Sequence, residues 1–146
     1  MIENIMVNNK IWRKETFKDA AKSCGLKRIS ERKSGYFAFS VFAHVTGQAI
    51  AAGNLIEEIR FFIGSQPPDL SMEAFQKDRH KAGLLAKEYA EMFETIIGSP
   101  RIANDNKIFE SKDFRIRVLA PQPVWVVISS FEVIKQLPYN YWSHNA

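Results

Sequence analysis

Apolar residues between 71 and 98 recur at steps of three and four, which is the period of one face of a helix. The residues on this face are Phe75, Ala82, Leu85, Ala86, Tyr89, Met92, Phe93 and Ile96. Asp69 or Ser71 can cap the start of the helix, and Gly98 ends it. The pattern predicts a helix roughly 40 Å long, around which the rest of the chain is organised.

The most apolar stretch of the chain, residues 36–63, precedes this helix. A helical stripe can be drawn through Phe37, Val41, Val45, Ala52, Leu55, Ile59 and Phe62. Residues 36–45 also alternate, so a strand is an alternative there. Small residues between 47 and 53 favour close packing of helices, and we predict one long helix over 36–63 with a kink near Gly47. A short Pro-containing connector, 64–70, would join the two helices into an antiparallel hairpin.

Residues 15–24 predict a short helix that Gly25 ends. Ala21, Gly25 and Leu26 resemble the small residue, turn glycine and apolar residue of the helix-turn-helix in bacterial and phage DNA-binding proteins. Glu31 stands where the second helix of that motif needs an apolar residue. The alternative is a capped helix followed by a basic loop.

The pattern of apolar and polar residues in the C-terminal third is typical of strands. Residues 114–119 alternate and 124–128 are apolar, with a Pro-rich turn between them, and 107–110 predict a third short strand. Ser129 and Glu132 form a capping-box pair that would open a brief helix.

Together these elements predict an α+β fold, mainly α, in a single domain over 1–146. Its parts are a basic helical segment (10–35), a long antiparallel helical hairpin (36–98), and a small antiparallel β-hairpin with a short helix (107–137). In layout alone this order is similar to phage small terminase subunits, in which a DNA-binding segment precedes an oligomerising helical hairpin and a β element. The resemblance implies DNA binding by the first part and self-association through the hairpin.

The net charge of +4 comes entirely from one segment. Residues 10–33 carry nine basic side chains against three acidic ones, whereas the rest of the chain is slightly acidic. Such asymmetry is typical of proteins that bind nucleic acids or acidic proteins. The candidate phosphate contacts are Arg13, Lys14, Lys18, Lys22, Lys27, Arg28, Arg32 and Lys33, joined by Arg115 and Arg117, which are expected to be exposed on the β-ribbon.

Aromatic residues near the basic segment and in the tail have two interpretations. Trp12 lies within the basic segment, and Tyr139, Tyr141 and Trp142 follow the predicted C-terminal helix. The tail rings could stack on bases, or they could close the core around that helix.

The sequence lacks the motifs of common enzymes, including phosphate loops, HExxH, CxxC and GxSxG. His44, His80 and His144 lie far apart, and Cys24 falls at the C-terminal end of a predicted helix, where the dipole does not favour a thiolate. The acidic pairs Glu57–Glu58 and Glu88–Glu91–Glu94 have no matching histidine motif and indicate solvated helix faces. We therefore predict no catalytic residue, metal or cofactor.

A single cysteine excludes an internal disulfide and favours a reducing compartment. Neither a signal-peptide pattern nor an uninterrupted apolar span is found, which predicts a soluble, cytoplasmic protein with no membrane contact. The leading hypothesis is a non-enzymatic nucleic-acid-binding protein, for DNA rather than RNA, that forms homo-oligomers. The alternative is an adaptor or inhibitor that docks an acidic or nucleic-acid-processing protein without contacting nucleic acid. A small enzyme that uses Cys24 or His80 is the third and least supported hypothesis.

Overall fold

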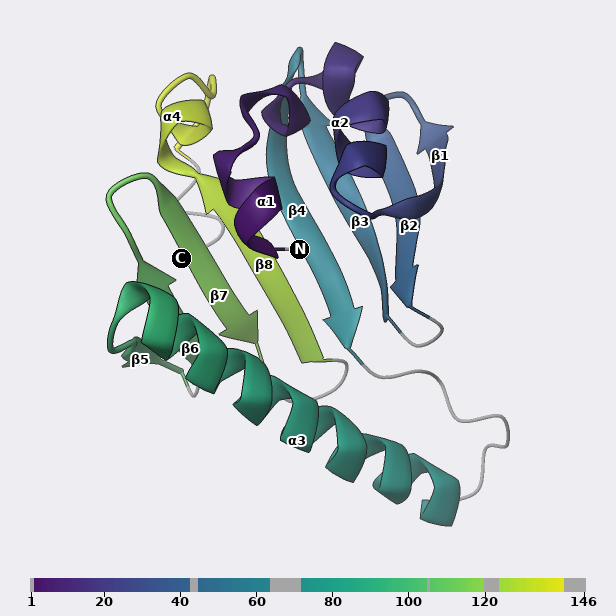
Figure 1. The fold of residues 1–146 in the computed structure, drawn as a ribbon, viewed down its shortest axis with the longest axis vertical. Helices are drawn as coiled ribbons and strands as arrows, with labels where there is room; N and C mark the ends of the chain where they lie inside the picture. The colour runs from purple at the N-terminus through teal and green to yellow at the C-terminus, as the bar shows by residue number, and fades with distance from the viewer. Residues whose placement is uncertain (1, 43–44, 64–71, 105, 120–123, 141–146) are drawn as a thin grey trace.

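One antiparallel sheet of eight strands organises the molecule (Figure 1). The computed structural model describes residues 2–42, 45–63, 72–104, 106–119 and 124–140. The strands are β1 (Lys27–Lys33), β2 (Tyr36–Phe42), β3 (Val45–Ala52), β4 (Leu55–Ile63), β5 (Arg101–Ala103), β6 (Asn106–Glu110), β7 (Phe114–Leu119) and β8 (Val124–Ser130). The helical elements are α1 (Ile2–Val7), η1 (Asn9–Trp12), η2 (Lys14–Thr16), α2 (Phe17–Ser23), α3 (Met72–Ile97) and α4 (Phe131–Ile134).

The sheet has a repeated arrangement, with strand order β1-β2-β3-β4-β8-β7-β6-β5. Helix α2 precedes the meander β1 to β4, and helix α3 precedes the meander β5 to β8. The last strands of the two meanders, β4 and β8, pair antiparallel at the centre, where Ile59 lies opposite Ile128. Each half therefore consists of one helix followed by four strands, and the eight strands form one continuous sheet.

The predicted helix over 36–63 is wrong, because this segment forms β2, β3 and β4. The alternating side chains of 36–45 did indicate the strand β2. The turn Gly53-Asn54 between β3 and β4 breaks the helical stripe, and the positive φ of 62° at Gly53 suits such a turn; a second turn, Ser34-Gly35, precedes the stripe. These dipeptides are hairpin signals that the helical interpretation overlooked.

The small residues of β3 serve sheet packing rather than helix packing. Gly47 lies opposite both Phe39 and Phe61 in the sheet. A Cβ at this glycine would come within 2.5 and 2.6 Å of two atoms of the Phe39 ring. Gly47 and Ala49 thus leave room for the aromatic side chains of neighbouring strands on the core face.

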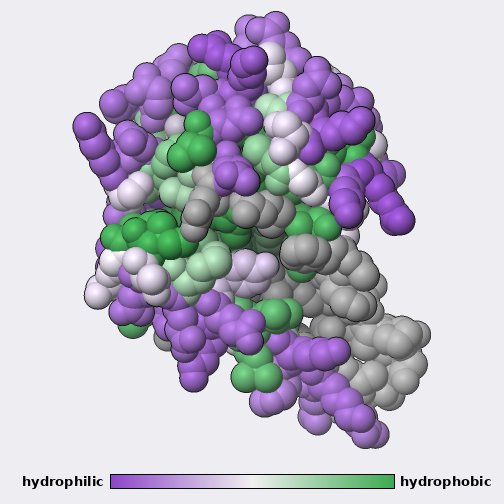
Figure 2. Space-filling view, in the orientation of Figure 1, coloured by the Kyte–Doolittle hydropathy of each residue, from purple (hydrophilic) through white to green (hydrophobic). Residues whose placement is uncertain are grey.

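The helices cover one face of the sheet and form the core with it (Figure 1). Three aromatic contacts join helical segments to strands: Phe17 to Phe37, with ring centroids 4.7 Å apart, Phe93 to Phe109 at 5.7 Å, and Trp12 to Phe114 at 5.8 Å. In Figure 2 a band of hydrophobic residues shows between the N-terminal helices and α3, with hydrophilic residues on either side of it. Burial of this apolar face is what fixes the helices on the sheet.

The long helix predicted at 71–98 is confirmed as α3, and the short helix at 15–24 is confirmed as α2. Ala82, Ala86, Ala90 and Phe93 face the core, as the periodicity of α3 requires. Because residues 36–63 form strands, α3 has no partner helix from this segment, and the predicted helical hairpin is not formed. The layout that resembles small terminase subunits is therefore absent as well. The proposed self-association surface on that hairpin is lost with it. The connector 64–70 lies outside the described residues.

The predicted strands at 107–110, 114–119 and 124–128 are present as β6, β7 and β8. They belong to the large sheet instead of forming a separate hairpin, so the mainly α fold class is wrong. Helix α4 follows at the expected place, but its N-cap is Ser130, whose side chain makes no capping hydrogen bond. The capping box of Ser129 and Glu132 is therefore not formed. Ser129 is buried in β8.

Among the described helices, none combines the length and apolar character that a membrane-spanning helix needs.

Candidate nucleic-acid interface

The turn between α2 and β1 is built by the residues that resemble a helix-turn-helix. Gly25 has a φ of 93°, and the Leu26 amide donates to the Ala21 carbonyl at 3.0 Å. Ala21 and Leu26 are buried, and they anchor the turn in the core. A strand follows in place of the second helix, because Lys27–Lys33 pairs with β2. Neither the helix-turn-helix nor the alternative basic loop is formed.

Strand β1 lies at the edge of the sheet and contains two bulges. Between the pairs Lys27–Ser40 and Ser30–Ala38, β1 advances three residues while β2 advances two. A second shift lies between Glu31 and Lys33. Bulges of this kind bend an edge strand and re-aim its side chains. Because of the two bulges, the basic side chains of β1 do not alternate strictly between the two faces of the sheet.

Arg28 occupies the first bulge with a φ of 53°. A residue other than glycine, asparagine or aspartate rarely adopts this left-handed conformation, since its Cβ crowds the backbone. Such strain persists only where the surrounding structure maintains it, and it often marks a functional position. Here it fixes the backbone from which an exposed arginine extends.

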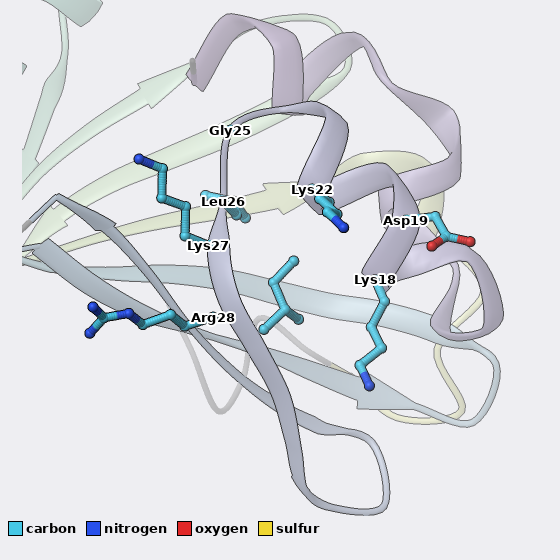
Figure 3. A pocket seen from close by; sticks show the side chains of 8 residues that line it. Lys18, Asp19, Lys22, Gly25, Leu26, Lys27 and Arg28 are labelled. Atoms are coloured by element: carbon cyan, nitrogen blue, oxygen red, sulfur yellow. The ribbon is translucent and has the colours of Figure 1, made fainter.

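Four basic residues line one pocket between α2 and the start of β1, and in Figure 3 the side chains of Lys27 and Arg28 extend from β1 away from α2. Lys18 and Lys22 come from α2, and Lys27 and Arg28 come from β1. The pocket has a volume of about 500 Å³, and Asp19 is the one acidic residue among the described residues that line it. Leu26 and Ile29 supply apolar surface. We call this hollow the basic pocket.

The four cations of the basic pocket have no ion pair or side-chain hydrogen bond in the part of the chain that the structure describes. Some other basic residues do form ion pairs. Arg60 and Arg117 bind Glu58, Arg101 binds Glu110, and Lys77 and Lys135 bind glutamates of their own helical turns. Positive charge at the basic pocket is thus left without a compensating carboxylate contact.

The remaining basic residues of the N-terminal segment lie elsewhere. The Lys14 Nζ donates to the Ser34 Oγ at 3.0 Å, beside the turn between β1 and β2. Arg32 and Lys33 are exposed at the end of β1 near that turn. The backbone of Arg13 forms an isolated antiparallel β-bridge with Leu55. Arg13 also lines a separate pocket of about 590 Å³, which Trp12 lines as well. The structure therefore brings together four of the eight predicted N-terminal contacts in one pocket.

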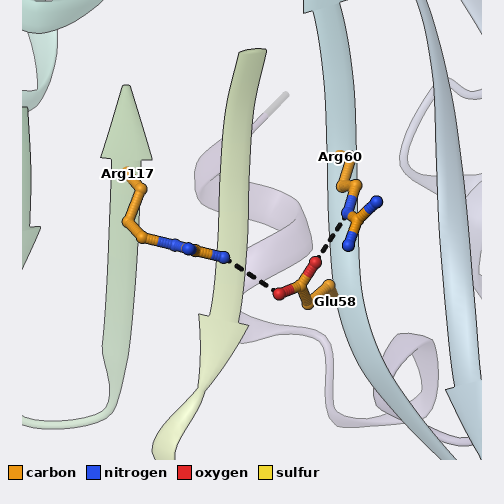
Figure 4. Close-up of polar contacts among 3 residues, drawn as sticks. All are labelled: Glu58, Arg60 and Arg117. Carbon is orange, nitrogen blue, oxygen red and sulfur yellow. Dashed lines mark hydrogen bonds and ion pairs between the residues drawn. The ribbon is translucent and has the colours of Figure 1, made fainter. Parts of the chain in front are cut away.

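The prediction that Arg115 and Arg117 are exposed is wrong. They are 4% and 8% exposed on the sheet face that points away from the core helices. The Arg117 Nη2 donates to Glu58 Oε1 at 2.9 Å, and the Arg60 Nε donates to Glu58 Oε2 at 2.6 Å (Figure 4). This ionic cluster reaches from β4 across β8 to β7, and the burial of both Arg115 and Arg117 excludes them from a surface basic strip.

Glu58 was predicted to lie on a solvated helix face, but it is a buried residue of strand β4. It is 1% exposed, and it has further interactions beyond the two ion pairs. The alternation of Glu58, Arg60 and Phe62 along β4 could have indicated one sheet face. Phe62 and Arg60 both contact the Trp125 ring, with the Arg60 guanidinium 5.5 Å from its centroid.

The aromatic side chains are not arranged around the basic pocket. Trp12 is 5% exposed and packs on Phe114, so it is unavailable for stacking on bases. Tyr139 is partly exposed, and burial together with a hydrogen bond to Glu57 raises its pKa. Burial and the neighbouring Glu88 raise the pKa of Tyr89. Tyr141 and Trp142 lie outside the described residues.

The other candidate chemical groups lie apart from the pocket. Cys24 is buried, and the Asn8 Nδ2 donates to its Sγ at 3.7 Å. His80 is exposed on α3, as predicted, while His44 and His144 lie outside the described residues. Across the described ranges, no group of three or more histidine, cysteine or acidic residues is placed to hold a metal.

Comparison with protein-family models, curated proteins and solved structures finds no match to this chain.

Proposed function

We propose that this protein binds nucleic acids, DNA rather than RNA, without catalysing a reaction, and that the basic pocket is its contact surface. The observation that supports the proposal is the gathering of Lys18, Lys22, Lys27 and Arg28 around one hollow without ion-pair partners. Cations of this kind contact phosphates and release counterions, which yields affinity that depends little on base sequence.

The exposed residues at the other end of β1 extend the same surface. Strand β1 is seven residues long, or roughly 23 Å at the rise of a strand. Arg32 and Lys33 at its end would meet phosphates further along the same strand of nucleic acid. Among the described residues that line the basic pocket none is aromatic, which favours contact with the backbone over stacking on bases.

The experiment is fluorescence anisotropy of labelled duplex and single-stranded oligonucleotides over a salt series. Replacing Lys18, Lys22, Lys27 and Arg28 with alanine should weaken binding at least tenfold. If all four contact phosphates of duplex DNA, the slope of log affinity against log salt should fall in magnitude by about 3 to 4.

A matched control replaces Lys81, Lys87, Lys107 and Lys112 with alanine. These lysines are exposed on α3, on β6 and in the turn after β6, and both quadruple variants lower the net charge from +4 to zero. The control should keep the wild-type salt slope. Equal losses in the two variants would show a non-specific effect of net charge and contradict the assignment of the site.

A protein-binding adaptor or inhibitor is the second candidate. It draws support from apolar side chains that α3 exposes to solvent, Met72, Leu84, Met92 and Ile96. Anisotropy that stays flat with every oligonucleotide at low salt would overturn the nucleic-acid proposal. An acidic protein would then be the expected occupant of the basic pocket.

A further inference from the structure

The sheet face that points away from the core helices is buried along β4, β8 and β7. Strand pairing places Arg60 and Arg117 on this face, on either side of Val127. Val127 is 1% exposed, and Ser129, the next residue of β8 on the same face, is fully buried. Helices α1, α2 and α3 lie on the opposite face (Figure 1), so they do not account for this burial.

Burial is confined to one part of this outer face. Gln48 of β3 pairs with Arg60 and with Ala38 of β2, so the same face continues across these strands. Here Ala38 and Gln48 are only half-buried, and Thr46 is exposed. Partial exposure of this kind is typical of a sheet face that meets water. The covering therefore lies over β4, β8 and β7 and not over the whole face.

The chain after α4 leads to this covered region. The Tyr139 hydroxyl, five residues beyond the end of α4, donates to the carboxylate of Glu57 in β4. Burial, this hydrogen bond and the charges of Glu57 and Glu58 raise the pKa of Tyr139. Because Glu58 binds the arginines of the ionic cluster, the segment returns to the sheet beside that cluster.

The sequence that follows has the length and the side chains to cover the rest of this region. Six residues come after Asn140, and they begin with Tyr141 and Trp142. Six extended residues span about 20 Å. Neighbouring strands are about 4.8 Å apart, so β7, two strands away from β4, lies only about 10 Å from it. Large rings suit a surface made of Val127 and the apolar stems of arginines.

We propose that residues 138–146 form a strap that crosses the outer face of β4, β8 and β7 and covers the ionic cluster. The strap shields Arg115 and Arg117 from solvent, so these arginines do not add to the exposed positive charge of residues 10–33. Occupation by the chain's own segment closes this part of the sheet to a second molecule. Coverage of the face does not depend on nucleic-acid binding.

The test measures how fast a thiol placed under the strap reacts with the reagent DTNB. Val127→Cys supplies this thiol, in the full-length chain and in a chain that ends at Leu137. We expect the reaction to be at least tenfold faster in the shorter chain. Cys24 is buried in the core, so its own thiol reports global unfolding.

Thr46→Cys is the matched control, because Thr46 is exposed on the same face in β3, and it should react equally fast in both chains. Equal rates for Val127→Cys in the two chains would overturn the proposal. A rate that rises on dilution of the full-length chain would assign the face to a second copy and overturn it too. If loss of 138–146 also exposes Cys24, Trp142→Ala in the full-length chain takes its place. There Val127→Cys should react faster while Cys24 stays protected, and an unchanged rate would contradict the strap.

Discussion

A single carboxylate, that of Glu58, binds two arginines on the sheet face that points away from the core helices. Its neighbour Glu57 is only half-buried, although the two residues are adjacent in the sequence. The register of β3 and β4 shifts at this point, from Ile50–Glu58 to Ala51–Ile56, so the local backbone and not the residue type decides this difference. Alternation along β7 places Arg117 on this same face, opposite the buried Val127 in the paired strand.

Glu58→Gln should destabilise the protein by about 3 kcal/mol, because removing one partner of a buried ion pair leaves its charge uncompensated. The matched control is Glu110→Gln, which breaks the exposed ion pair with Arg101 and should change the free energy of unfolding by less than about 1 kcal/mol. Urea denaturation measures both. Similar losses in the two variants would show that burial does not strengthen the Glu58 contacts.

At the scale of elements, β1 combines an edge position, two bulges and a left-handed arginine. Charged residues and bulges on an edge strand also prevent sheets from pairing with one another. That role explains polar side chains along β1, but it does not require a left-handed backbone at Arg28. The left-handed backbone at this exposed arginine is consistent with the proposal that residues of the basic pocket bind a ligand.

The left-handed backbone at Arg28 allows the effect of a substitution on stability to be distinguished from its effect on binding. Arg28→Gly should be more stable than Arg28→Ala by about 1 kcal/mol, because glycine adopts a φ near 53° without steric cost. Both variants should weaken oligonucleotide binding alike, since both lose the guanidinium. Urea denaturation and anisotropy measure the two effects. Equal stability of the glycine and alanine variants would show that the backbone at this position is not strained.

Elements differ in how far their own residues reveal them. Helix α3 was predictable because Ala82, Ala86 and Phe93 repeat at the helical period and lie against one surface. Residues 36–63 were wrongly predicted as a helix, because the alanine and glycine residues at 47–53 are compatible both with close-packed helices and with the crowded face of a sheet. The choice depended on Phe39, whose ring occupies the space beside Gly47.

For the whole molecule, the central pairing of β4 with β8 joins residues far apart in the chain. Ile59 and its partner Ile128 are separated by 69 positions. Such pairing is established only after the two meanders and α3 are brought together. Chains dominated by non-local strand pairing fold more slowly than helical ones, because the entropy of loop closure opposes those contacts.

We therefore expect refolding on the scale of milliseconds to seconds, as for other sheet proteins. Stopped-flow dilution from urea, followed by tryptophan fluorescence, measures this rate. Trp12 and Trp125 report on the helical layer and on the sheet. Refolding within microseconds would be the behaviour of the helical hairpin and would contradict this topology.

The sequence by itself determined the helices α2 and α3, the strands β6 to β8, and the concentration of positive charge in residues 10–33. Each is a property of neighbouring residues, readable from local period or composition. Only the tertiary structure decided that 36–63 form strands, that Glu58 and Arg117 form a buried ion pair, and that four basic residues line one pocket while Arg13 does not. These outcomes depend on contacts between distant segments, where burial and pairing override local preference.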